Sequence, residues 1–435
     1  MPYVQTGTPT GLAGRLATLT GDRRLVNGSL ERGRGSALDE ILAILVFMAL
    51  PMEMPVLAML RLPLAGMVLL LAALYWRDTV PILRRGWIFL LVPAFCLLSV
   101  AWSPLPPATL RFTAYMTVPL IAAIVLASRL SHRQVVVAVF LAKFAFAIAG
   151  LVFLEKAFVG GVGGGWAILG VYPQKNVLST HTITMMIAAT AILLDGRYRS
   201  IWRLLALPGL CLGLFYIANA RSATGILLTV AGIGAMASLA GIWRPAAQVR
   251  GLRPLMACVA VLAVTLAVMV FASMARTDPW TFLLDLFGKE SSLNGRTVIW
   301  THARELISQN PLFGVGAGAF WQPGVGAARQ IAGMFSADPS NVFNFHNAFF
   351  EIVVQTGLIG LAVYLVSVGT ALKTLVLDWW RRQKAIDGFF VVLALIILAR
   401  SQTESEAFHF MGLSMLVFWT GVFLAIRRRV TGSAD

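Results

Sequence analysis

Charged side chains are scarce in this chain of 435 residues. Asp, Glu, Lys and Arg together make up 12% of it, whereas soluble domains contain about 25%. Hydrophobic residues make up 58%, and the mean hydropathy is +0.80. This composition excludes a soluble enzyme and a disordered scaffold, because it leaves long apolar segments that need a lipid environment. The sequence therefore predicts a polytopic membrane protein.

Cysteine and histidine are also rare. Cys96, Cys211 and Cys258 each lie inside an apolar run and far from one another, which excludes a disulfide framework and a zinc motif. The five histidines show no metal-ligand spacing with cysteine or acidic residues. We therefore expect neither a metal nor another cofactor.

Acidic residues are few: 19 Asp and Glu stand against 35 Lys and Arg, a net charge of +16. In a soluble protein this excess would indicate nucleic acid. Here most basic residues flank apolar runs, so they are better explained as signals of membrane orientation. We expect membrane lipids, and not nucleic acid, as the surroundings of this chain.

Twelve apolar segments approach the roughly 20 residues that a membrane-spanning helix needs. We therefore expect an all-α polytopic fold with about twelve transmembrane helices. The segments lie near residues 39–58, 62–76, 87–102, 111–128, 135–154, 176–194, 203–219, 223–243, 254–274, 347–371, 387–400 and 409–426.

Basic residues alternate between the connecting segments. If the N-terminus is cytoplasmic, the inner segments hold 23 of the 35 lysines and arginines, as the positive-inside rule requires. The sequence thus predicts two cytoplasmic tails, 1–38 and 427–435. The first nine spans occupy 39–274, a large external loop occupies 275–345, and the last three spans occupy 346–426. No apolar signal-peptide core begins the chain.

The large external loop is expected to fold as a lid. Residues 280–287 have an apolar face suited to a membrane surface, and 294–309 have helical apolar spacing that Asn310-Pro311 ends. A second external segment, 155–175, carries a glycine run over 160–165 without the Lys-Ser or Lys-Thr of a phosphate-binding loop. We interpret that run as a hinge or close-packing loop.

Several basic residues fall on the external side, against the general trend. Ionisable groups in or beside a membrane span are costly and are candidates for function. A basic group of this kind predicts an anionic ligand, such as a phosphate or pyrophosphate, at the outer membrane surface. The residues are Arg111, Lys175, Arg221, Arg296, Arg304 and His346.

Each of these residues also has an alternative interpretation. Arg221 lies in a very short turn, where it could be an arginine that extends to the headgroups. Lys175 and Arg111 could anchor helices at the interface. Arg296 could form a surface salt bridge, and Arg304 could lie on the solvated face of its helix. His346 could be structural, but its ordinary titration range suits a general base at neutral pH.

Three stretches resemble the O-antigen ligase family of bacterial inner membranes, which belongs to a wider group with O-antigen polymerases. One stretch has Gly295-Arg296-Thr297 with Trp300 and continues to Asn310-Pro311-Leu312-Phe313-Gly314-Val315-Gly316. Another has His346-Asn347 followed by Glu351, Gly357, Gly360 and Leu361. The third has Tyr172-Pro173-Gln174-Lys175-Asn176, with Ala220-Arg221-Ser222 further on. Gln174 departs from the family, because many relatives have histidine there.

This resemblance implies a glycosyltransferase-C-like helical membrane fold and a reaction without metal. The donor would be O-antigen linked to undecaprenyl pyrophosphate, and the acceptor a sugar hydroxyl of lipid A–core on the periplasmic side of the inner membrane. We assign His346 as catalytic base and Arg221 and Arg296 to the pyrophosphate, with inversion at the anomeric carbon. Further substrate contacts are expected from Lys175, Arg111, Arg304 and Asn347.

Two alternatives remain open. An O-antigen polymerase would use the same chemistry and join lipid-linked repeats; a single dominant external loop favours the ligase. A transporter of an anionic solute would need charges near the middle of the bilayer and often has repeated halves. The sequence shows no clear repeat, and its basic residues gather on one side.

Overall fold

The computed structural model describes residues 35–51, 59–159, 165–243, 245–256, 258, 296–322, 324–334, 343–408 and 412–431. Most of the predicted N-terminal tail lies outside the described residues. So do nearly all of the predicted ninth span and the predicted surface helix at 280–287. The account that follows concerns the described residues.

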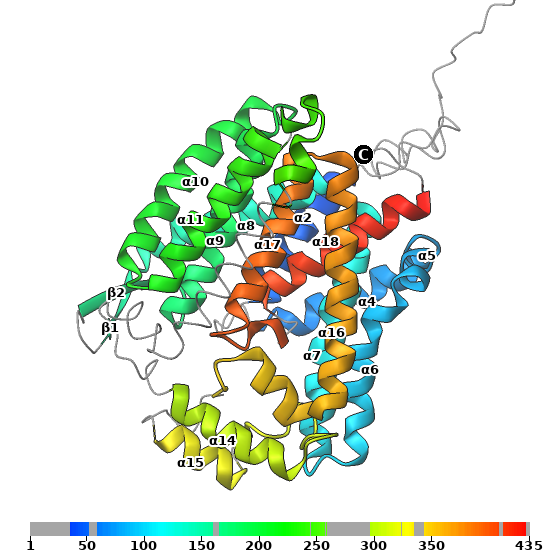
Figure 1. The fold of residues 1–435 in the computed structure, drawn as a ribbon, viewed down its shortest axis with the longest axis vertical. Helices are drawn as coiled ribbons and strands as arrows, with labels where there is room; N and C mark the ends of the chain where they lie inside the picture. Colours follow the sequence, from blue (N-terminus) through cyan, green and yellow to red (C-terminus); the bar gives the residue numbers. More distant parts are fainter. Residues whose placement is uncertain are drawn as a thin grey trace, which may run out of the picture.

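The described chain is a helical bundle with a smaller helical region at one end (Figure 1). Its helices are α2 (Ala37–Ala49), α4 (Arg61–Leu74), α5 (Trp76–Arg85), α6 (Leu91–Leu98), α7 (Pro106–Arg129), α8 (His132–Val152), α9 (Lys175–Leu194), α10 (Ser200–Asn219), α11 (Ala223–Ser238), α14 (Arg296–Gln309), α15 (Gly326–Gly333), α16 (Ala348–Arg382), α17 (Ala385–Arg400) and α18 (Leu413–Thr431).

One element departs from the predicted all-α fold. Strands β1 (Glu155–Val159) and β2 (Gly165–Gly170) pair antiparallel as a hairpin on either side of the glycine run. The prediction failed here because the glycines hide short strand signals such as Trp166-Ala167-Ile168-Leu169, which lie between spans.

Six of the described helices are long and apolar enough to cross a membrane, or seven if the bent pair α4–α5 is one span. They are α7, α8, α9, α10, the helix at 224–243 and α16. This agrees with a polytopic membrane protein, while the full count of twelve spans stays a prediction.

The segment after the second predicted span is helical. It contains Arg77, Arg84 and Arg85 in helix α5, which bends by 93° from α4. The break falls at Tyr75, whose backbone is not helical (φ −99°, ψ 29°). Ile82 is buried on one face of α5 while its arginines are on another, so the helix is amphipathic.

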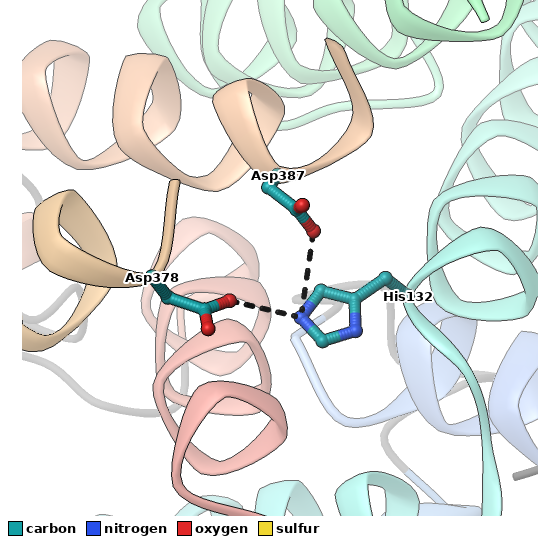
Figure 2. A group of neighbouring side chains, drawn as sticks. All are labelled: His132, Asp378 and Asp387. Carbon is teal, nitrogen blue, oxygen red and sulfur yellow. Dashed lines mark ion pairs between the residues drawn. The ribbon is translucent and has the colours of Figure 1, made fainter. Parts of the chain in front are cut away.

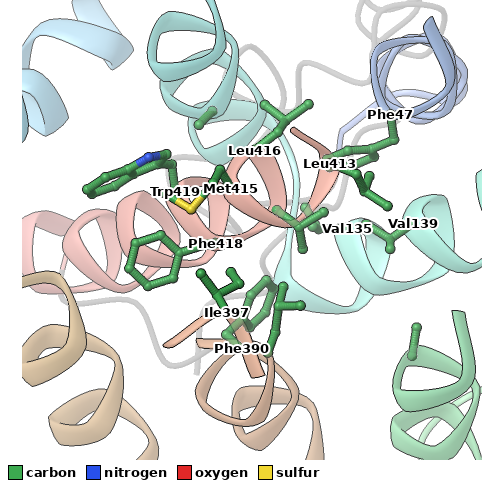
Figure 3. Close-up of a cluster of buried hydrophobic side chains, with 14 of the residues drawn as sticks. Phe47, Val135, Val139, Phe390, Ile397, Leu413, Met415, Leu416, Phe418 and Trp419 are labelled. Carbon is green, nitrogen blue, oxygen red and sulfur yellow. The ribbon is translucent and has the colours of Figure 1, made fainter. Parts of the chain in front are cut away.

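Helix α18 forms the centre of the bundle. It packs against α7, α9, α16 and α17, and nearly all of its residues are buried. Figure 3 shows its Met415, Phe418 and Trp419 among side chains from neighbouring helices. Only 28% of the apolar stretch of α10 is buried, and only 22% of that of the helix at 224–243, which includes α11. Their outward faces are therefore suited to lipid.

The predicted inner turns gather at one end of the bundle, which we call the Arg428 end. Arg427 donates to the carbonyls of Ala127 and Leu130 at 2.8 Å. Arg133 lies 3.5 Å from Asp195. These contacts bring together the turns after α7 and α9 and the last turns of α18. The opposite end carries α14 and α15, and we call it the α14 end (Figure 1).

Helix α16 is interrupted at the α14 end. The predicted single span at 347–371 was wrong in this respect: Gly357 is left-handed (φ 68°, ψ −174°), and the helix runs on to Arg382. A Cβ on Gly357 would lie 2.1 Å from the Leu312 carbonyl oxygen. Leu358 N donates to the Pro311 carbonyl at 2.8 Å. The segment after α14 thus fills the break in α16, which only glycine permits.

Candidate functional site

Four segments that are distant in sequence meet at the carboxylate of Glu404. Its Oε1 accepts from Asn176 Nδ2 at 2.8 Å and from an Arg296 guanidinium nitrogen at 3.0 Å. Its Oε2 lies 3.4 Å from His346 Nδ1. Glu404 lies in the short connection after α17, Asn176 in the first turn of α9, and Arg296 at the start of α14. We call Glu404, Arg296, His346 and Asn176 the Glu404 cluster.

The charge of Glu404 is stabilised by its neighbours. Burial acts to raise the pKa of its carboxyl, but the hydrogen bond with His346 and the charges of Arg296 and Arg400 outweigh it. The pKa therefore lies below its ordinary value of 4.5. At neutral pH Glu404 is an anion that holds two basic side chains in place.

The backbone of His346 is held in an unfavourable conformation. Its φ is +50°, which costs about 1–3 kcal/mol for a residue other than glycine. Its N–H donates to Asn344 Oδ1 at 2.8 Å, and Asn344 Oδ1 also accepts from Ser405 Oγ at 3.0 Å. The ring of Phe343 meets the imidazole edge-on at 5.8 Å. The surroundings thus fix both the backbone and the ring of His346.

Glu351 contacts the loop that carries His346. It is fully buried and accepts from the Phe345 backbone N–H at 2.9 Å and from Ser405 Oγ at 3.4 Å. On the other side, Trp300 Nε1 donates to the Phe345 carbonyl at 2.9 Å. Glu351, in the first turn of α16, therefore positions the His346 loop by binding the backbone of the loop.

Asn347 acts as the N-cap of α16. Its side-chain oxygen accepts from Phe349 N and Phe350 N, and its Nδ2 donates to the Gln402 carbonyl at 3.1 Å. Both polar atoms of this amide are used within the protein. The structure thus gives Asn347 a structural role, because it joins the His346 loop to the segment that carries Glu404.

The two predicted arginines of α14 lie in different surroundings. Arg296 forms a salt bridge with Glu404, and its side chain is only 18% exposed. Arg304 is exposed, and its guanidinium lies 5.8 Å from the centre of the Phe350 ring. Arg304 therefore has a cation–π contact of its own.

Arg221 lies in the turn before α11, a helix that packs against α9. It has a left-handed backbone (φ +48°) in the turn between α10 and α11. A Cβ on Gly225, in the first turn of α11, would lie 2.8 Å from Ser179 Oγ on α9. Lys175 begins α9, immediately before the cluster residue Asn176. The turn with Arg221 and the start of α9 with Lys175 thus adjoin at the same end of the bundle.

The Arg221 guanidinium packs on the hairpin. A Cβ on Gly165, the first residue of β2, would lie 2.7 Å from Arg221 Cζ. Arg111, in contrast, bonds to Gln322 Oε1 at 3.2 Å in the loop after α14. Neither Arg111 nor Arg304 is among the described residues that contact Glu404.

Glu404 and Asn176 were not predicted as site residues from the sequence. The signal available for Glu404 was its place in the polar stretch Ser401-Gln402-Thr403-Glu404-Ser405-Glu406 between two apolar segments. A group of external cations needs a counter-charge, and Glu404 lies in one of the predicted external connections. Asn176 gave no separate signal beyond its neighbour Lys175.

A second polar cluster lies at the Arg428 end (Figure 2). Ligand atoms of His132, Asp378 and Asp387 lie within 4.8 Å of one another, as metal ligands would. However, Arg428 donates to Asp378 Oδ2 at 2.6 Å and to Asp387 Oδ1 at 2.9 Å. His132 Nε2 lies 3.9 Å and 3.8 Å from the same two oxygens. The guanidinium thus supplies the positive charge that a metal ion would bring.

Comparison with known proteins bears on the basic residues of the α14 end. Residues 208–365 match the family model described as O-Antigen ligase. The chain is also 28% identical, over 356 residues, to "Exopolysaccharide production protein ExoQ" of Rhizobium meliloti (strain 1021), covering 79% of this chain and 78% of that relative. The matched region includes Arg221, Arg296 and His346. The resemblance predicted from the sequence is therefore confirmed.

Proposed function

We propose that this protein transfers a glycan from a polyprenyl pyrophosphate, such as undecaprenyl pyrophosphate, to a sugar hydroxyl. The match of residues 208–365 to the family model described as O-Antigen ligase supports this proposal. The observation that carries the proposal is the Glu404 cluster. It combines one basic side chain suited to phosphate, Arg296, with one suited to proton transfer, His346. Lys175 precedes the cluster residue Asn176 in α9, and Arg221 lies in the turn before α11, which packs against α9.

The leaving group requires the arginines. When the bond between the anomeric carbon and the phosphate oxygen breaks, its electron pair stays on the pyrophosphate. Arg221 and Arg296 stabilise that charge, and one well-placed donor contributes about 3 kcal/mol. Glu404 engages one nitrogen of Arg296, and a guanidinium has five N–H donors. The arginine can thus be oriented by Glu404 and still bind phosphate.

His346 is the proposed base. Glu404 contacts its Nδ1, which orients the imidazole and leaves Nε2 for the acceptor, as the carboxylate does in other histidine-based sites. The acceptor hydroxyl gives its proton to Nε2, and its oxygen attacks the anomeric carbon as pyrophosphate leaves. Attack opposite the leaving group inverts the anomeric centre. Lys175 is proposed to add a further phosphate contact.

The proposed location is the bacterial inner membrane, with both termini in the cytoplasm and the α14 end in the periplasm. The collection of basic turns at the Arg428 end supports this orientation. Periplasmic glycan transfer also fits a pyrophosphate-activated donor, since such a donor needs no nucleotide.

Two acceptors are compatible with this site. Transfer to lipid A–core, the ligase reaction, is supported by the description of the matching family. Joining of lipid-linked repeats, the polymerase reaction, is supported by the relative named for exopolysaccharide production, which matches over most of both chains. Arg111 and Arg304 lie on the helices that frame the α14 end and are proposed to contact the glycan.

A deletion strain tests both the transfer and its acceptor. Lipopolysaccharide and secreted polysaccharide are analysed by gel electrophoresis, with wild-type and His346→Ala proteins used for complementation. Loss of all polymer from the core indicates the ligase, and a single attached or secreted repeat indicates the polymerase. Unchanged glycans in the deletion strain would reject the proposed transfer.

A further inference from the structure

The hairpin β1–β2 displays two large aromatic side chains. Phe158 and Trp166 face each other across the strands, with ring centroids 5.8 Å apart and edge-to-face geometry. Each is 65% exposed. An exposed pair of this size needs an environment that accepts apolar surface, and the described part of the protein does not cover it.

The pair continues the apolar surface of a membrane-spanning helix. Leu151, Val152 and Phe153, at the end of α8, are exposed and lead directly into β1. Strand β2 packs against α8, α9 and α10, and Figure 1 shows the hairpin at the outer edge of the bundle, below α10. The exposed rings thus lie at the rim where lipid-facing helices end.

Basic side chains accompany the rings. Lys156 is exposed on β1, and the Arg221 guanidinium lies against Gly165 of β2. Aromatic rings prefer the level just below the headgroups, and basic groups prefer the phosphates beside them. The hairpin presents both types of side chain within a few residues.

We propose that the Phe158–Trp166 face of the hairpin is seated in the lipid bilayer, at the headgroup level of the leaflet at the α14 end. The occupant of this surface is ordinary membrane lipid, and Lys156 lies at its phosphates. The hairpin then sets the depth of Arg221. This last consequence rests on the proposed function, whereas the seating in lipid does not.

Depth-dependent quenching tests the seating. In the full-length chain, Cys96, Cys211 and Cys258 are replaced by alanine, and Phe158→Cys, Trp166→Cys or Gln330→Cys carries an environment-sensitive fluorophore. Gln330 is exposed on α15 and serves as the aqueous control. Each protein is reconstituted in phosphatidylcholine vesicles that contain lipids with nitroxides near the headgroup or deep in the acyl chain. No glycan donor is present.

We expect several-fold stronger quenching at 158 and 166 than at 330, and stronger quenching by the shallow nitroxide than by the deep one. Equal quenching at all three sites would overturn the proposal. Quenching that arises only after polyprenyl pyrophosphate is added would also overturn it and assign the surface to the donor. Because no activity is measured, failure of the proposed transfer leaves the result unaffected.

Discussion

The two ends of the bundle use similar groups in opposite ways. At the Arg428 end, a guanidinium that is 2% exposed is matched by two carboxylates and closed by surrounding helices. At the α14 end, a single carboxylate serves an arginine that is 18% exposed and a histidine that is 25% exposed. In the closed cluster the guanidinium is buried and paired with both carboxylates. In the open cluster the two basic side chains stay partly exposed, and this difference separates a structural link from a candidate site.

The largest expected effect concerns the closed cluster. Arg428→Ala leaves Asp387 and Asp378 buried without this partner, which should cost about 3–5 kcal/mol of folding free energy. The unfolding temperature in detergent measures the loss. Arg429→Ala is the matched control, because Arg429 is exposed and donates to the Thr374 carbonyl. Adding Asp387→Asn to Arg428→Ala should recover part of the loss; equal stability of both arginine variants would contradict a structural role.

The next effect concerns the open cluster. His346→Ala should slow glycan transfer about 10²- to 10⁴-fold, the usual contribution of a general base. Binding of the lipid pyrophosphate should persist, because the arginines hold it. The rate of transfer and the affinity for the donor are measured with purified protein and a lipid-linked donor. His302→Ala is the control, since His302 pairs with Glu305 on α14. Loss of donor binding would make His346 a phosphate ligand instead of a base.

These two clusters also show what the sequence could and could not predict. Helices were predictable because apolar runs and the positions of arginines reflect the membrane directly. The helix at Arg296–Gln309 was confirmed, including its end before Asn310-Pro311. The break at Gly357 was not predictable, because it depends on the Leu312 carbonyl, which packs there from another segment.

The cations of the Glu404 cluster could be singled out from the sequence, and its anion could not. Arg296 and His346 stand out because positive charge is unexpected on the predicted external side. Glu404 does not, since its importance arises from contacts with α9, α14 and the His346 loop. For Asn347, its neighbour suggested a substrate contact, which stays a prediction, while contacts from other segments give its amide a place as the cap of α16.

A smaller effect is expected for Glu404→Gln. Groups that orient a functional histidine contribute about 10- to 100-fold, so transfer should fall by this factor. Glu406→Gln is the control, since Glu406 pairs with Arg400 at 3.1 Å. Unchanged transfer in Glu404→Gln would remove Glu404 from the site.

The same residue predicts a pH dependence. The pKa of Glu404 is lowered on folding from 4.5, so its stabilising contribution is complete above that pH and is lost as the pH falls through the folded-state value. Unfolding temperatures of wild type and Glu404→Gln should therefore converge below pH 4.5. A constant difference across that range would contradict the assigned ionisation.

The smallest effect tests whether the hairpin positions Arg221. Gly165→Ala introduces a Cβ that would lie 2.7 Å from Arg221 Cζ, so the guanidinium must move. A displacement of about 1 Å can cost up to 10²-fold in rate, and we expect about tenfold here because the arginine side chain can partly adapt. Gly196→Ala is the control, as its Cβ meets nothing within 4 Å. The loss should appear as weaker binding of the pyrophosphate donor with an unchanged unfolding temperature. If Gly165→Ala instead lowers the unfolding temperature and leaves donor binding intact, the hairpin supports the fold and does not position Arg221.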